Sequence, residues 1–289
     1  MPSKRLCLIK QLKPINDNPQ VHNLVKERFD REAAILEKLS ENSPQIPKLY
    51  AYFEENNQFY LVEEFIQGET LSQRIQSKGV FTDDQVKEIL VSILQVLIYV
   101  HGQKIIHRDI KPDNIILRIY DNLPILIDFG AVKETMGTVV SNSGHSLNSI
   151  VIGTPGFMPS EQAIGRPVYS SDIYALGLTA IYLLTGKTPE MLESDPMTGK
   201  IYWRQFALNT NISLAAVLDK TISLRSNERY LTAKEMLEAL QNTPSIVATN
   251  IVVPAPTPAP TQVISPVTSK PVSNPRTLPE WVKAIIIGS

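Results

Sequence analysis

The sequence predicts an α+β fold in which a small lobe of strands with one helix precedes a larger helical lobe. Three patterns support this prediction: period-two alternation of apolar residues near the N-terminus, helical periodicity after residue 82, and a change of composition near residue 243. A chain of 289 residues is long enough to build two such lobes, each with its own core. Two packed units leave a cleft between them, where ligands commonly bind.

The small lobe is expected to contain three strands and one helix. Residues 5–10 alternate in the manner of a short strand, and residues 24–39 place apolar side chains on one helical face. Residues 50–65 read as a hairpin that turns at Asn56-Asn57.

The larger lobe is expected to be mostly helical. Thr82 and Gln85 have the spacing of a capping box, and apolar residues follow them at helical intervals. Ser171 and Asp172 are expected to cap a second apolar helix, and residues 233–240 form a last amphipathic one. We place the lobes at residues 1–67 and 68–242.

Residues 243–289 are expected to form a disordered, proline-rich tail. Nine of the 21 prolines lie between Pro244 and Pro279, and proline neither donates a backbone hydrogen bond nor continues a helix. The folded domain is therefore expected to end near residue 242.

Composition excludes several classes of function. The 28 basic and 29 acidic residues give a net charge of −1, which argues against a nucleic-acid binder that relies on phosphate contacts. Cys7 is the single cysteine, so no internal disulfide can form and a reducing, cytoplasmic location is expected. The four histidines do not stand at the spacing of zinc ligands.

The segment from His107 to Asn114 contains the side chains that phosphoryl transfer requires. Asp109 supplies a carboxylate that can orient or deprotonate a hydroxyl, Lys111 a cation, and Asn114 an amide that can bind a metal ion. Pro112 prevents a regular helix, so the segment is expected to be a shaped loop.

A second motif, Asp128-Phe129-Gly130, begins 14 residues after Asn114. A carboxylate at the end of an apolar strand, followed by a permissive glycine, suits Mg²⁺ binding. Each residue also has a plainer interpretation: Asp109 as a helix cap, Asp128 as a strand end and Lys111 as a surface charge.

Together, in this order and at this spacing, the two motifs resemble the protein kinase family. The resemblance covers about residues 4–241, and phrases such as Val-Ile-Gly-Thr-Pro-Gly-Phe are similar to the cyanobacterial-type branch of bacterial Ser/Thr kinases. It implies a protein kinase-like two-lobed fold with a truncated N-lobe. It also implies transfer of the ATP γ-phosphoryl group to Ser or Thr hydroxyls of protein substrates, with ATP and Mg²⁺ as cofactors.

The resemblance assigns a role to each matching residue. Asp109 matches the catalytic base, and Lys111 matches the cation near the γ-phosphate. The remaining assignments are Asn114 and Asp128 as Mg²⁺ ligands, Lys10 as the lysine that holds the α- and β-phosphates, and Glu32 as its ion-pair partner. For Lys10 a surface lysine at a strand end is the competing interpretation.

The segment that follows the hairpin resembles the hinge of the family, with backbone groups of Glu64 and Ile66 facing adenine. Glu63 then stands directly before the hinge, where an acidic residue is unusual. Two alternatives stay open for Glu63: it pairs with a cation, or it tilts toward solvent.

Residues 128–161 match an activation segment. Thr154 is expected beside Asp109 and Lys111, and Glu161 is expected to form a buried salt bridge with Arg229. Asp172 is expected to hold the catalytic loop. The acceptors available for a regulatory phosphate are Thr135, Thr138, Ser141, Ser143, Ser146 and Ser149.

One expected feature is missing, because only nine residues precede Lys10 and the first glycine is Gly68. The glycine-rich loop of the family therefore has no counterpart before Lys10, and one edge of that strand is expected to lie exposed. Either the chain is a shortened kinase, or it is a catalytically impaired pseudokinase or scaffold that binds protein partners. Phosphoryl transfer by these residues alone is expected to be weak or absent.

The resemblance also bears on the tail and on partners. In this branch a proline-rich linker often leads to a membrane, and residues 278–287 resemble the start of a transmembrane helix. Membrane attachment is expected only if the tail continues beyond Ser289. The oligomeric state does not follow from the sequence.

Overall fold

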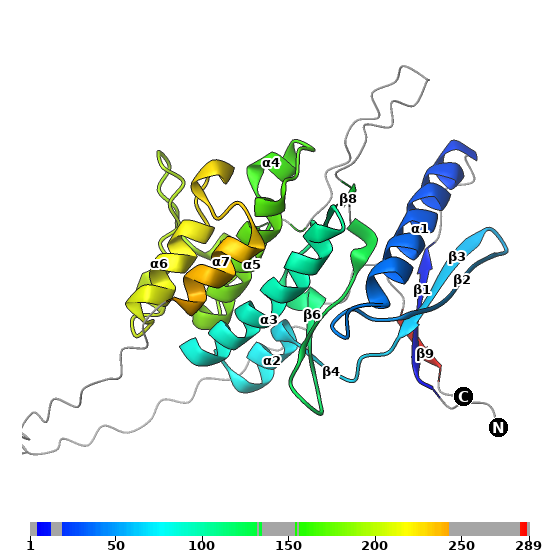
Figure 1. Cartoon of the computed structure of the whole chain (residues 1–289), viewed down its shortest axis with the longest axis horizontal. Coiled ribbons are helices and arrows are strands. Elements are labelled where there is room, and N and C mark those ends of the chain that lie inside the picture. The colour runs from blue at the N-terminus through cyan, green and yellow to red at the C-terminus, as the bar shows by residue number, and fades with distance from the viewer. Residues whose placement is uncertain are drawn as a thin grey trace, which may run out of the picture.

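The computed structural model describes residues 5–12, 19–131, 133–134, 154, 156–242 and 284–287. A small lobe built on a sheet and one long helix lies beside a larger helical lobe (Figure 1). This arrangement is the predicted α+β fold. The rest of the tail after residue 242, and most of the segment between residues 132 and 153, lie outside the described residues.

The small lobe contains the three strands and the helix that the sequence predicted. Its elements are β1 (Cys7–Leu12), α1 (Pro19–Ser40), β2 (Leu49–Glu55) and β3 (Gln58–Glu64). β1 lies two residues later than expected, and α1 begins five residues earlier. The sheet runs in the order β2-β3-β1-β9, and β3 is antiparallel to both β1 and β2.

Alternation along β3 decides which of its side chains are buried. Phe59 and Leu61 are buried and pack with Phe29 and Ala33 of α1 in a separate small core. Because side chains two residues apart share a face of a strand, Glu63 lies on the same buried side. The strand therefore carries a carboxylate into the interior of the lobe.

The outer edge of β1, expected to be exposed, is covered by the C-terminal strand β9 (Ala284–Ile287). β9 is antiparallel to β1, with Ile285 opposite Ile9 and Ile287 opposite Cys7. These four residues therefore differ from the expected disordered tail and from the start of a transmembrane helix. β-Branched isoleucine favours a strand, and an open sheet edge offers it backbone partners.

We expect removal of residues 284–289 to expose this edge and to promote self-association. The truncated chain should elute earlier on size exclusion at high concentration and melt at a lower temperature, because unpaired backbone groups of β1 become available to other chains. Removal of Gly288 and Ser289 alone, which lie beyond β9, is the control. Identical elution and melting for both truncations would contradict the prediction.

The larger lobe contains six α-helices among the described residues. They are α2 (Leu71–Lys78), α3 (Asp83–Gly102), α4 (Ser160–Ala163), α5 (Tyr169–Thr185), α6 (Ile212–Thr221) and α7 (Ala233–Gln241). Its short strands are β4 (Gly68–Thr70), β5 (Ile105–Ile106), β6 (Ile115–Arg118), β7 (Pro124–Leu126) and β8 (Lys133–Glu134). They pair in the order β4-β6-β7 and β5-β8.

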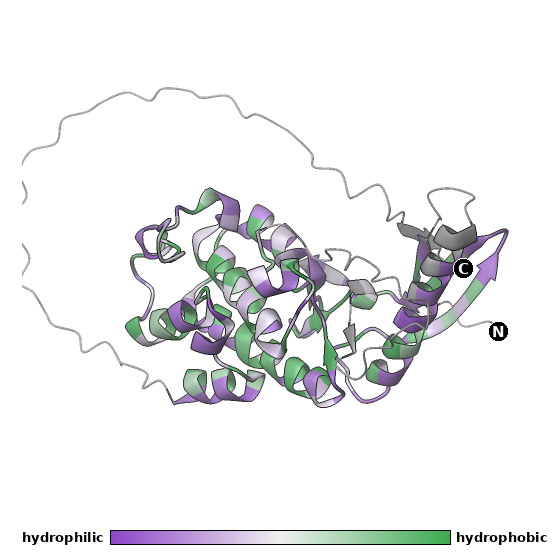
Figure 2. Ribbon diagram, turned by 90° about the horizontal axis from the view of Figure 1, so that it is seen from above, coloured by the Kyte–Doolittle hydropathy of each residue, from purple (hydrophilic) through white to green (hydrophobic). Residues whose placement is uncertain are grey.

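The core of this lobe is formed mainly by α3 and α5. In Figure 2 the apolar colour concentrates on helices inside the larger lobe, and the tip of the β2–β3 hairpin is more polar. The predicted Thr82 capping box is confirmed, with the Gln85 N–H donating to the Thr82 hydroxyl at 3.3 Å. The predicted cap of α5 is confirmed for Ser171, whose hydroxyl accepts the backbone N–H of Val168 at 3.1 Å. It is wrong for Asp172, because the helix begins at Tyr169 and the Asp172 side chain accepts the His107 N–H instead.

Among the described helices, α3 is long and apolar enough to cross a membrane by length and composition. Its buried residues include Val86, Leu90, Leu94 and Leu97, which belong to the core of the larger lobe. This packing is typical of a core helix in a folded domain.

Candidate active site

Asp172 of α5 holds the loop between β5 and β6 in place through hydrogen bonds. One Asp172 oxygen accepts the His107 backbone N–H at 2.9 Å and lies 2.8 Å from His101 Nε2; the other accepts the Arg108 N–H at 2.8 Å. Asp172 is 1% exposed, and burial alone would raise its pKa. The hydrogen bond from His101 and the neighbouring donors outweigh burial and lower the pKa, so Asp172 stays ionised.

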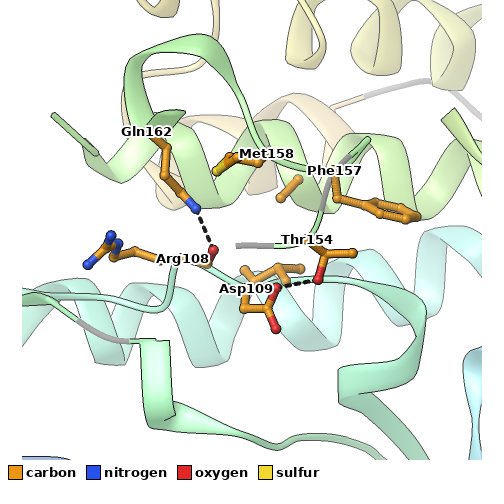
Figure 3. Close-up of a pocket in the computed structure, with 8 residues that line it drawn as sticks. Arg108, Asp109, Thr154, Phe157, Met158 and Gln162 are labelled. Carbon is orange, nitrogen blue, oxygen red and sulfur yellow. Dashed lines mark hydrogen bonds between the residues drawn. The ribbon is translucent and has the colours of Figure 1, made fainter. Parts of the chain in front are cut away.

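Asp109, Lys111 and Asn114 lie together in this loop. Thr154 lies against Asp109 (Figure 3). The Thr154 hydroxyl donates to Asp109 Oδ1 at 2.7 Å, and Lys111 Nζ lies 2.6 Å from that hydroxyl and 2.9 Å from Asp109 Oδ2. Asn114 Nδ2 donates to Asp109 Oδ2 at 2.9 Å and to its carbonyl at 2.8 Å. The expected position of Thr154 is confirmed.

Pro112 begins the single helical turn Pro112–Asn114, which brings Asn114 back to Asp109. The proline has no N–H to leave unsatisfied at the start of this turn. The loop is therefore shaped locally by its own sequence, as predicted.

Asp128 stands beside this loop, two residues after the end of β7. The Ile127 N–H donates to the Asn114 carbonyl at 3.0 Å, which fixes the two segments side by side. Asp128 has a φ of 66°, in the left-handed region, so the chain turns sharply at this residue. Phe129 packs edge-on against the buried His107 ring with centroids 4.7 Å apart.

Gly130 lets the same segment approach α1. A Cβ on Gly130 would lie 3.0 Å from Glu32 Oε2, a contact that real side chains rarely make. Glycine at this position therefore keeps the Asp128 turn close to the Glu32 carboxylate.

Lys10 lies at the centre of three carboxylates, from α1, β3 and the Asp128 turn. Its Nζ is 3.0 Å from Glu63 Oε1, 3.6 Å from Asp128 Oδ1 and 3.7 Å from Glu32 Oε1. The Lys10 side chain is 16% exposed, which rules out the surface interpretation. Of the alternatives for Glu63, pairing with a cation is the correct one.

The charges in this cluster shift the pKa values of Lys10, Asp128 and Glu32. Burial opposes the charge of Lys10, but Glu63, Asp128 and Glu32 outweigh it and raise the lysine pKa. Asp128 is also buried, and Lys10, His107 and Lys111 hold its pKa below the ordinary value. Burial raises the pKa of Glu32 to about 7 despite the opposing effect of Lys10.

The raised pKa of Glu32 predicts a pH-dependent stability. The folded chain holds the Glu32 proton up to about pH 7, whereas the unfolded chain releases it near 4.5. The Glu32 contribution to the free energy of unfolding should therefore fall as pH rises through this window and level off above it. Urea denaturation should show that the free energy of unfolding falls less between pH 5 and pH 8 for Glu32→Gln than for the wild type.

Glu37, an exposed glutamate of the same helix, provides the control for that experiment. Glu37→Gln should keep the wild-type pH dependence. If Glu32→Gln also keeps it, the raised pKa of Glu32 is contradicted.

The structure limits what the predicted hinge can offer to a ligand. The Glu64 N–H donates to the Lys48 carbonyl at 2.8 Å, so this N–H is not free. The Glu64 carbonyl and the backbone of Ile66 stay the predicted contacts for adenine. Ile66 itself is buried, 8% exposed.

Glu161 and Arg229 form the predicted salt bridge, with N···O distances of 2.7 and 3.2 Å. The Arg229 side chain is fully buried, and Ser171 donates to Glu161 Oε1 at 2.7 Å. The bridge anchors the end of the segment that carries Thr154.

Two further residues support the loop and were missed at the sequence level. Gln162 Nε2 donates to the Arg108 carbonyl at 2.6 Å (Figure 3). The His101 ring nitrogen Nε2 forms a hydrogen bond with the Asp172 carboxylate. Gln162 directly follows Glu161, the predicted anchor of the activation segment, and this neighbouring position could have marked it as a residue that supports the loop.

The donor set fits a magnesium ion better than a transition metal. The described residues contain no cluster of three or more His, Cys, Asp or Glu side chains that could hold a metal ion. Asp128 is ionised. The Asn114 side chain directs its NH₂ to Asp109, so its side-chain oxygen Oδ1 is the atom that could bind a cation. Mg²⁺ prefers oxygen ligands and usually keeps several waters, so one or two protein ligands suffice.

Comparison with known proteins agrees with this geometry. The family model described as "Protein kinase domain" matches residues 2–244. The chain belongs to the protein kinase family. The predicted resemblance and the predicted fold class are thereby confirmed.

Similar members of the family include cyanobacterial proteins. The chain is 61% identical over 241 residues to serine/threonine-protein kinase PknA of Nostoc sp., covering 83% of this chain and 43% of the relative. It is 56% identical over 247 residues to serine/threonine-protein kinase C of Synechocystis sp., covering 86% and 46%. The chain thus spans less than half the length of these curated relatives.

A solved structure shows the same fold. The PknI kinase domain of Mycobacterium tuberculosis superposes with a TM-score of 0.61 over 81% of this chain and 84% of that domain. The two sequences are 22% identical, so the likeness concerns the fold alone.

Proposed function

We propose that the chain transfers the γ-phosphoryl group of ATP to Ser or Thr hydroxyls of protein substrates. The observation that carries the proposal is the contact of a hydroxyl with both Asp109 and Lys111. The Thr154 hydroxyl reaches the carboxylate and the ammonium at once, within 2.7 Å of each. A substrate hydroxyl at Asp109 would find a base for its proton and a nearby cation for the charge that develops on the phosphoryl group.

The residues around the cleft fit ATP and Mg²⁺. Lys10 is a partly buried cation suited to the α- and β-phosphates, and Asp128 and Asn114 would hold the metal. When bound, Mg²⁺ would neutralise charge on the transferring phosphoryl group. Glu32 would keep Lys10 in place from α1.

The family relatives favour a protein kinase over a pseudokinase. The six residues of the predicted set are all present, in two contacting groups: Lys10, Glu32 and Asp128, and Asp109, Lys111 and Asn114. Proteins carrying Ser or Thr are the proposed substrates. The cytoplasmic location and the membrane tether remain predictions.

The test is incorporation of phosphate from γ-labelled ATP into a generic basic protein substrate, followed by phosphoamino-acid analysis. We expect slow, Mg²⁺-dependent labelling of Ser and Thr and none of Tyr. Labelling that is absent while Mg-ATP still binds would favour the scaffold alternative. Labelling of tyrosine would contradict the assignment to Ser/Thr kinases.

A further inference from the structure

Glu63 is the closest of the three carboxylates to Lys10. Its Oε1 lies 3.0 Å from the ammonium, about 0.6 Å nearer than Asp128 and Glu32. The contact follows from the register of the sheet: Lys10 pairs with Leu61, and Glu63 is two residues further along β3 on the same face.

Glu63 depends strongly on this contact. It is 2% exposed, and no hydrogen bond is made to its Oε1 within the described part of the chain, so Lys10 provides a charge contact rather than a well-directed hydrogen bond. A buried carboxylate is costly unless a cation or hydrogen-bond donors lie beside it. Glu63 therefore attracts the ammonium toward β3.

We propose that Glu63 is a positioning residue that competes with nucleotide phosphates, and with Glu32, for the ammonium group of Lys10. This inference rests on the proposed function, because it assumes that ATP phosphates reach Lys10. Binding then requires Lys10 to leave its nearest partner, and Glu63 adds a negative charge close to the site of a polyanion. Glu63 lowers the affinity for ATP without touching the reacting atoms.

The test compares Glu63→Gln, which keeps the shape and removes the charge, with the wild-type chain by calorimetric titration of Mg-ATP. We expect Kd to fall about tenfold, since both the competition and the repulsion disappear. The KM for ATP should fall in parallel, with kcat changed by less than about twofold. Without nucleotide the melting temperature should fall, because Lys10 loses its nearest partner.

Tighter binding of Mg-ATP together with a lower melting temperature separates a positioning role from a structural one. A residue that only supports the fold would lower the melting temperature and leave Mg-ATP binding unchanged or weaker. Glu63→Asp, which retains the charge, should bind Mg-ATP within about threefold of the wild type. Glu63→Met serves as a second neutral variant of similar size if Glu63→Gln fails to fold.

Glu55→Gln is the matched control, because Glu55 is an exposed glutamate of the same sheet and loses the same charge. It should bind Mg-ATP like the wild type. If the wild type binds but the neutral variants bind no more tightly, the inference is overturned and the proposed function stands. If none of the chains binds Mg-ATP, both this inference and the proposed function are overturned.

Discussion

Asp109→Asn should lower the rate of phosphoryl transfer by about a thousandfold, within the range that general bases contribute. The amide cannot accept the substrate proton, yet it keeps the size of the side chain and can still bond to Thr154 and Asn114. Mg-ATP affinity should change less than the rate, because Lys10 and Asp128, which are predicted to hold the phosphates and the metal, keep their own contacts. The measurement is single-turnover transfer from γ-labelled ATP at saturating enzyme.

Asp113→Asn is the matched control for this variant. Asp113 lies in the same loop, two residues after Lys111, but its side chain is exposed. Its substitution should leave the transfer rate near that of the wild type. An Asp109→Asn chain that retains a third of the wild-type rate would show that Asp109 is not the base.

Asp172→Asn should destabilise the larger lobe by about 3 kcal/mol, the order seen when one member of a buried charged network is replaced. Both carboxylate oxygens accept backbone N–H groups, one from His107 and the other from Arg108. Whichever way the amide turns, its NH₂ faces a backbone donor, which then lacks an acceptor. The melting temperature should fall by about 10 °C, and phosphoryl transfer should fall with it as the loop loosens.

Asp121→Asn provides the comparison, since Asp121 pairs with Arg118 on the surface of a turn. Exposed ion pairs contribute little, so this variant should melt close to the wild type. Equal melting temperatures for the two variants would contradict the role given to Asp172.

Local motifs made much of the site predictable from the sequence. Asp109, Lys111 and Asn114 are within six residues, so one loop conformation suffices to bring them together. The resemblance to protein kinases supplied the long-range partners, including the Lys10–Glu32 and Glu161–Arg229 pairs. Their side chains are separated by 20 residues or more, and no local rule pairs them.

The features that the sequence analysis left open or missed depend on tertiary contacts. The burial of Glu63 follows the period-two alternation of Phe59 and Leu61, a signal that was available, but its partner depends on the register between β1 and β3. The pairing of β9 with β1 joins residues more than 270 positions apart. Asp172 was misplaced as a cap because acidic residues near a helix start usually bond to the helix itself, whereas this one bonds to the catalytic loop.

Lys10 and Asp128 are expected to form one nucleotide site with the catalytic loop. Calorimetric titration with ATP, with and without Mg²⁺, tests it most directly in the wild-type chain, Lys10→Met and Asp128→Asn. We expect saturable, Mg²⁺-dependent binding by the wild type that weakens at least tenfold in both variants, since one loses the phosphate cation and the other a metal ligand. Binding that is unchanged in both variants, or absent from the wild type, would contradict it.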